Sequence, residues 1–114
     1  MTFDIEQLIS DIKSTASGIL SKDIETVRGF SNRQLHGIAN QTALIASGIA
    51  SGQITESTRD FFLQQLVELA QNFANTLVGL VIATIEKLWN AIVSIIWSAI
   101  SKATHIALPA FNPL

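Results

Sequence analysis

Two ionisable residues, Glu86 and Lys87, stand next to each other in a long stretch that is otherwise uncharged. No other charged residue occurs in residues 69–101. Inside a membrane, ionisable side chains in such a stretch would serve a proton or ion path or an ion pair between subunits. In a soluble assembly they would form salt bridges between helices or subunits, with modest energy. The sequence leaves both roles open.

The rest of the chain offers no pattern typical of catalysis or of metal binding. There is no cysteine, and the two histidines, His36 and His105, are far apart in sequence. We interpret His36 as a polar residue on a helix face and His105 as a residue at a helix C-terminus. No Gly-rich phosphate loop, zinc-protease motif or nucleophile motif occurs. We therefore expect a non-enzymatic protein with no catalytic residue, no metal and no cofactor.

Polar and small residues in the second half of the chain lie three or four positions apart, which places them on one stripe of a helix. The other positions are mostly Ile, Leu, Val and Trp. Such a helix lines an oligomeric pore, packs stripe to stripe in an assembly, or exposes only its stripe to water in a bundle. We call this stripe the polar seam, and its members are Asn72, Thr76, Gly79, Ala83, Lys87, Asn90, Ser94, Ser98 and Ser101.

The apolar side of the same stretch carries both tryptophans of the chain. Trp89 and Trp97 would lie about 12 Å apart along a helix, which is too close for them to mark both edges of a membrane. We expect the two rings, together with Ile92 and Ile96, to form an apolar interface. The alternative is that one ring lies at a membrane edge and the other in the core.

The elements that carry these residues are helices, because helical periodicity is strong and strand alternation is not sustained. No proline precedes Pro109, and apolar residues recur every 11 positions in the first half. Eleven residues in three turns is close to the relaxed helix. We therefore predict one long amphipathic helix over residues 1–51. The repeat consists of Ile5, Ala16, Val27, Ile38 and Ile49.

Four glycines fall within this first helix, and their spacing also reflects the 11-residue interval. Gly18 and Gly29 are 11 positions apart, as are Gly37 and Gly48. This favours close contacts with another helix at small residues. Since glycine costs about 1 kcal/mol relative to alanine inside a helix, the alternative is a break in the region from Gly29 to Gly37.

A turn is expected at residues 52–57, with Gly52 ending the first helix. A second, hydrophobic helix then covers residues 56–106, and an extended tail containing Phe111 and Leu114 covers residues 107–114. So short a turn predicts an antiparallel helical hairpin, all-α in class. Residues 73–100 form a stretch long enough to cross a hydrocarbon core of about 30 Å.

Only 14% of the residues are charged, against about 25% in typical domains. A lone hairpin would leave much of the second helix in water, as an apolar patch far above a few hundred Å². We therefore expect the hairpin to be stable only as an oligomer or in lipid. The expected partners are copies of the chain and membrane lipid. Nucleic acid is not expected, because the net charge is −2.

These patterns predict an oligomeric helical protein whose second helix inserts in a membrane or lines a membrane passage, as a channel, conduit or anchor. The alternative is a structural component of a large soluble assembly, such as a phage virion, tail or filament, in which neighbouring subunits bury this helix. The expected location is a membrane or a large assembly. The N-terminus carries acids where a secretory signal peptide carries Lys or Arg, so no signal peptide is expected.

Overall fold

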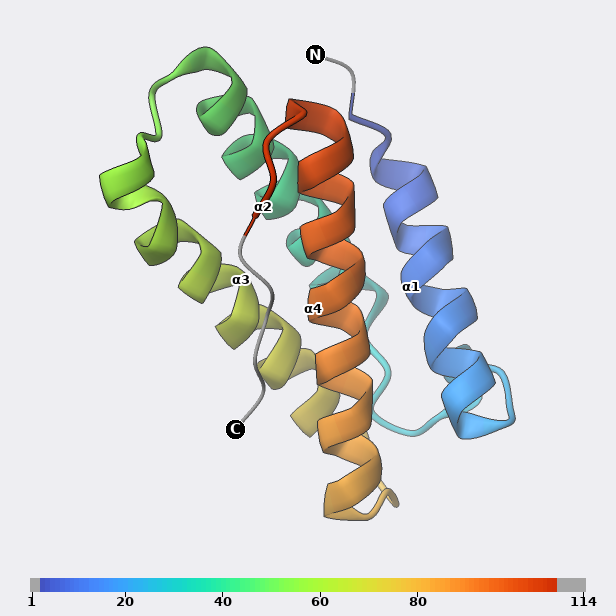
Figure 1. Ribbon diagram of the computed structural model, residues 1–114. Coiled ribbons are helices and arrows are strands. Elements are labelled where there is room, and N and C mark those ends of the chain that lie inside the picture. Colours follow the sequence, from blue (N-terminus) through green and yellow to red (C-terminus); the bar gives the residue numbers. More distant parts are fainter. Residues whose placement is uncertain (1–2, 109–114) are drawn as a thin grey trace.

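The computed structural model describes residues 3–108, and all regular structure in that range is helical (Figure 1). The prediction of an all-α fold is confirmed. The elements are α1 (Ile5–Leu20), the short 3-10 helix η1 (Ile24–Thr26), α2 (Asn32–Ser51), α3 (Glu56–Asn75) and α4 (Ile82–Thr104). Sequence reasoning expected two long helices, whereas the described chain forms four α-helices in a compact bundle.

The four helices run alternately up and down, so that helices adjacent in sequence are antiparallel (Figure 1). α1 packs against α4 and α2, and α3 packs against α2 and α4. α2 and α4 also pack against each other, so each of them contacts all three other α-helices. The bundle measures 42 × 29 × 19 Å, with a radius of gyration of 13.8 Å. The ends of helices and their connections thus gather at two opposite ends of the molecule.

The prediction of a single helix over residues 1–51 is wrong, because residues 21–31 separate α1 from α2. α1 ends in a cap at Ser21, which takes a left-handed conformation with φ 57°. α2 then starts behind Ser31, whose side chain accepts a hydrogen bond of 3.1 Å from the Gln34 N–H. The alternative prediction, a break within this helix, is confirmed. The break begins earlier than expected, and Gly37 lies inside α2.

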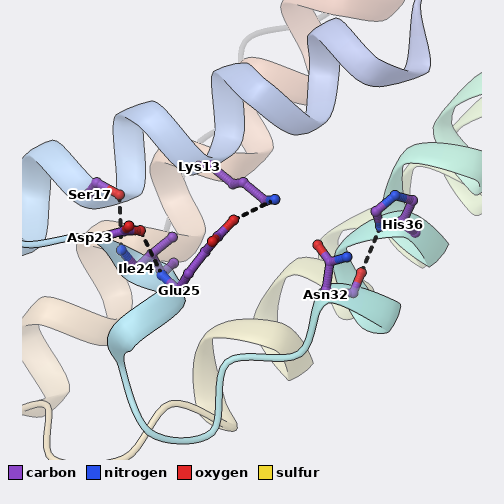
Figure 2. Close-up of polar contacts among 7 residues, drawn as sticks. All are labelled: Lys13, Ser17, Asp23, Ile24, Glu25, Asn32 and His36. Atoms are coloured by element: carbon purple, nitrogen blue, oxygen red, sulfur yellow. Dashed lines mark hydrogen bonds and ion pairs between the residues drawn. The ribbon is translucent and has the colours of Figure 1, made fainter.

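Polar contacts with α1 fix the path of this interruption (Figure 2). The Ser17 hydroxyl accepts a hydrogen bond of 3.0 Å from the N–H of Ile24, the buried first residue of η1. The Lys13 ammonium lies 2.7 Å from the Glu25 carboxylate. Because η1 is tied to α1 at both points, the chain folds back along α1 before α2 begins.

The second long helix, expected over residues 56–106, is also interrupted. α3 ends at Asn75 and α4 begins at Ile82, with Gly79 between them at φ +87°. The stretch 73–100 is therefore divided between two helices. Within residues 3–108, no helix is both long and apolar enough to cross a membrane.

The turn expected at residues 52–57 joins α2 to α3 at residues 52–55. Gly52 caps α2 with φ +83°, as expected. The N-cap of α3 is Thr55, whose N–H donates a hydrogen bond of 3.1 Å to the Thr58 hydroxyl. Residues 105–108 have no regular structure. The remainder of the extended tail expected over residues 107–114, with Phe111 and Leu114, lies outside the described residues.

The core lies between the inner faces of the helices and includes the apolar face of α4. From α4 it takes Leu88, Ile92, Val93, Ile96 and Ile100, all nearly inaccessible to water. The need for a second copy or for lipid was inferred from a lone two-helix hairpin. Here the other helices of the same chain cover this face, so that need does not follow from the fold.

Candidate functional site

The most unusual surface of the bundle is the loop between α3 and α4 together with the first residues of α4. We call residues 78–83 the apolar tip, because none of them carries a polar side chain. Val78 is 52% exposed, Val81 69% and Ile82 75%. In Figure 1 the tip lies at the bottom of the view, where α4 begins. Three large aliphatic side chains thus face water within five consecutive positions.

The local sequence explains why the chain turns here without polar side chains. The Thr76 hydroxyl, directly after α3, donates a hydrogen bond of 2.7 Å to the Phe73 carbonyl, which closes the end of the helix. Leu77 is buried and anchors the loop to the core. Gly79 takes a positive φ that other residues rarely adopt. Val81 then starts α4 without a side-chain cap, although its carbonyl accepts from Ile85.

Contacts with the first connection, residues 21–31, hold the tip in place. The Val78 N–H donates a hydrogen bond of 2.8 Å to the Arg28 carbonyl. Gly29 adopts φ +92° and packs so closely that a Cβ there would overlap the Thr76 carbonyl oxygen. Two segments far apart in sequence are therefore joined backbone to backbone, and the tip is presented on a fixed base.

Glu86 and Lys87 lie just above the tip, both exposed, on the first turns of α4. Glu86 follows Ile82 by four positions and Lys87 follows Ala83 by four, so each stands over a tip residue. Within residues 3–108 the only ion pair joins two other side chains. Their predicted role in a salt bridge between subunits stays a prediction.

The polar seam does not face inward. Its residues belong to two helices and the loop between them, and only Asn90 and Ser101 are half-buried; the other members are exposed. This arrangement corresponds to the bundle alternative, in which α4 keeps its apolar face in the core and its polar stripe in water. It does not correspond to a helix whose polar stripe lines a passage enclosed by the chain.

Part of the seam lines a groove of about 610 Å³ between the first half of α1 and the second half of α4. Ser94 and Ser98 face it from α4. Asp4 and Asp11 line the α1 side, and both already accept hydrogen bonds from Gln7, through its N–H and its side-chain amide. The groove is therefore lined by hydroxyls, by Lys102 and by carboxylates that already accept hydrogen bonds, and no histidine lines it.

The expected apolar interface lies inside the bundle. Ile92 and Ile96 are buried core residues, and Trp89 and Trp97 are half-buried and pack against that core. Ile92 and Ile96 therefore pack against helices of the same chain. Neither tryptophan belongs to the tip.

The four glycines do not serve as points of contact between helices. Gly18 and Gly37 are exposed, and a Cβ at either position would meet no atom within 4 Å. Gly48 packs against the side chain of Ile54 in the turn that follows α2. Gly29 lies in the connection before α2 and packs against the α3–α4 loop. Close packing at Gly29 and Gly48 thus involves connections.

The histidines occupy separate parts of the surface. His36 Nδ1 lies 2.9 Å from the Asn32 carbonyl oxygen within α2 (Figure 2). His105 caps the end of α4 in a left-handed conformation with φ 59°. Among the described residues, no group of three or more His, Asp or Glu side chains is placed to hold a metal ion.

No protein-family model, curated protein or solved structure matches this chain. Sequence reasoning missed the tip, whose one local signal is Gly79 within the apolar run that precedes Ile82. The exposed aliphatic side chains of the tip are the strongest functional feature of the described surface.

Proposed function

We propose that the protein is a non-enzymatic helical bundle that attaches to the surface of a membrane through its apolar tip. The carrying observation is the exposure of Val78, Val81 and Ile82 at one end of the bundle. The sequence predicted insertion into a membrane or the lining of a membrane passage. The proposal retains the association with lipid but places the protein on the membrane surface. Surface attachment is preferred to a passage lined by α4, because the apolar face of that helix packs in the core.

The expected strength of attachment follows from the area that lipid would cover. Fully burying a Val, Leu or Ile side chain contributes about 1.5–3 kcal/mol. The exposed parts of the three tip side chains therefore offer roughly 3–6 kcal/mol in total. This is comparable with a weak, reversible anchor that needs a second contribution to hold.

Vesicle flotation with a matched pair of variants tests the proposal. Val81 and Leu44 are almost equally exposed, at 69% and 67%, but Leu44 lies in the middle of α2, away from the tip. We expect Val81→Ser to reduce the fraction bound to phospholipid vesicles at least threefold, and Leu44→Ser to leave it unchanged. An equal loss in both variants, or no loss in Val81→Ser, would contradict attachment through the tip.

The second candidate is the structural component of a large assembly. It is favoured by exposed apolar side chains elsewhere, namely Leu44 at 67% on α2 and Phe61 at 65% on α3. Phe61 also stacks edge to face on Phe62, with ring centroids 5.4 Å apart, which holds the ring in place. Light scattering would detect the oligomer that this candidate requires, and Phe61→Ser should dissociate it. A monomer in both proteins would leave this candidate without support.

A further inference from the structure

We propose that the tip binds bilayers carrying anionic headgroups, and that the distribution of charge orients the bundle with the tip toward the lipid. This inference rests on the proposed function and specifies the lipid class. The occupant of the tip surface is therefore an anionic phospholipid bilayer. The charges that surround residues 78–83 differ in sign from those of the rest of the molecule.

The end of the bundle that carries the tip is cationic, although the whole chain has a net charge of −2. This end contains residues 21–33 and 76–87, together with Lys13, whose ammonium is paired with Glu25. Its five cations are Lys13, Lys22, Arg28, Arg33 and Lys87, and its three acids are Asp23, Glu25 and Glu86.

The rest of the described chain has the opposite balance, with six acids against two cations. Most of these acids lie where α1 and α3 begin, at the end opposite to the tip. The six acids are Asp4, Glu6, Asp11, Glu56, Asp60 and Glu68, and the two cations are Arg59 and Lys102.

Two of the cations, Arg28 and Lys87, are adjacent to the tip, and a third, Arg33, is connected through its neighbour Gln34 to Thr76, two residues before the tip. Arg28 accepts the hydrogen bond from Val78 through its carbonyl, so its exposed side chain starts beside the loop. Lys87 stands one helical turn beyond Ala83. Arg33 precedes Gln34, whose Oε1 lies 3.3 Å from the Thr76 hydroxyl. Against these three, one acid, Glu86, lies within a turn of the tip on α4.

Because salt screens charges over short distances, the cationic end of the bundle can be attracted to an anionic membrane although the whole chain is acidic. The Debye length is about 8 Å at physiological ionic strength, whereas the long axis of the bundle measures 42 Å. With the tip at the surface, the cations around it feel the anionic headgroups, and the acids at the far end are screened from them. Attraction of a basic residue near an anionic surface is worth about fivefold in affinity. Electrostatic attraction therefore supplies the second contribution to membrane affinity, in addition to burial of the aliphatic side chains in lipid.

The test compares vesicles of phosphatidylcholine alone with vesicles that contain phosphatidylglycerol as well, at low and at high salt. We expect the protein to bind the anionic vesicles at least tenfold more tightly, and high salt to remove the difference. Lys87→Gln should weaken binding to anionic vesicles about fivefold. Lys102→Gln is the matched control, since it removes an exposed lysine from the far end of α4 and should change affinity less than twofold.

The outcomes separate the two proposals. Equal binding to both vesicle types that still depends on Val81 would overturn the lipid class and leave attachment through the tip standing. Equal losses in Lys87→Gln and Lys102→Gln would overturn the proposed orientation. Anionic binding that is unaffected by Val81→Ser would overturn the proposed function itself. Circular dichroism of each variant establishes that the helices are intact.

Discussion

The Val78 N–H donates a 2.8 Å hydrogen bond to the carbonyl of Arg28, a residue 50 positions earlier in the chain. This bond joins the α1–α2 connection to the α3–α4 loop at one end of the bundle. Gly29, the next residue after Arg28, packs against the backbone at Thr76. The apolar tip is therefore supported by the first half of the chain, and disturbing that half should disturb the tip.

Gly29→Ala is expected to destabilise the protein strongly. Its φ of +92° disfavours a side chain, and the new Cβ would overlap the Thr76 carbonyl oxygen, which belongs to backbone that cannot rotate away. The two effects together should lower the free energy of unfolding by roughly 2–4 kcal/mol. Urea denaturation followed by circular dichroism measures this loss.

The matched control is Gly37→Ala, at an exposed position in the second turn of α2. A Cβ there meets no atom within 4 Å, and the position is helical. Alanine should therefore raise the free energy of unfolding by about 0.5–1 kcal/mol. If Gly37→Ala were as destabilising as Gly29→Ala, the assignment of the close contact to Gly29 would be incorrect.

Phe73→Ala is expected to cost about 3–5 kcal/mol of stability, because it leaves a cavity in the core. Phe73 is fully buried, and its ring meets that of Phe30 edge to face with centroids 6.0 Å apart. Phe61→Ala removes the same atoms from a side chain that is 65% exposed, and we expect a much smaller loss. Similar thermal midpoints for the two variants would argue against this placement of Phe73.

Ser31→Ala should lower the free energy of unfolding by about 1 kcal/mol, because α2 loses its N-cap. The Ser31 hydroxyl accepts the Gln34 N–H at 3.1 Å, one of the backbone donors that the helix itself leaves without a partner. Ser47→Ala serves as the control, since Ser47 is exposed in the interior of α2 and alanine favours helix there. A stability loss of the same size at both positions would contradict the assignment of Ser31 as the N-cap of α2.

Substitutions in the tip should leave the fold almost unchanged. Ile82→Ser alters a side chain that makes few contacts with the rest of the protein, so it should change the free energy of unfolding by less than about 0.5 kcal/mol. Val81→Ser places serine at the N-cap of α4, which has no side-chain cap, so it should raise the free energy of unfolding by about 0.5–1 kcal/mol. Chemical denaturation measures this directly. A loss above about 2 kcal/mol would mean that these side chains pack in the core.

Four of the five residues in the 11-residue repeat are buried and Ile5 is half-buried, but the continuous helix that the repeat predicted is wrong. Ala16, Val27, Ile38 and Ile49 are all buried, yet Val27 lies in the connection between two helices. A repeat of apolar residues indicates which side chains pack in the core. It does not indicate whether the backbone between them is helical, because a residue in a connection between two helices can also pack in the core.

The second interruption was harder to predict because the loop itself is apolar. Leu77, Val78, Leu80 and Val81 surround the single Gly79, with no proline or polar turn residue among them. Such a run is equally typical of the interior of a buried helix. Length was the usable signal, since helices in globular proteins usually run 8–20 residues and one of about 50 needs a coiled coil or a repeat. The turn at Gly52 was predictable because glycine stands there beside polar residues.

The contrast between Gly29 and Gly37 also bears on how this fold tolerates change over evolutionary time. The overlap with Thr76 requires glycine at position 29 in any descendant that keeps the two connections in contact. Position 37 is free to drift toward alanine or a polar helix former, because open space surrounds it. Two glycines that look alike in the sequence are thus under different steric constraints, and the one that the fold requires is the one that supports the tip.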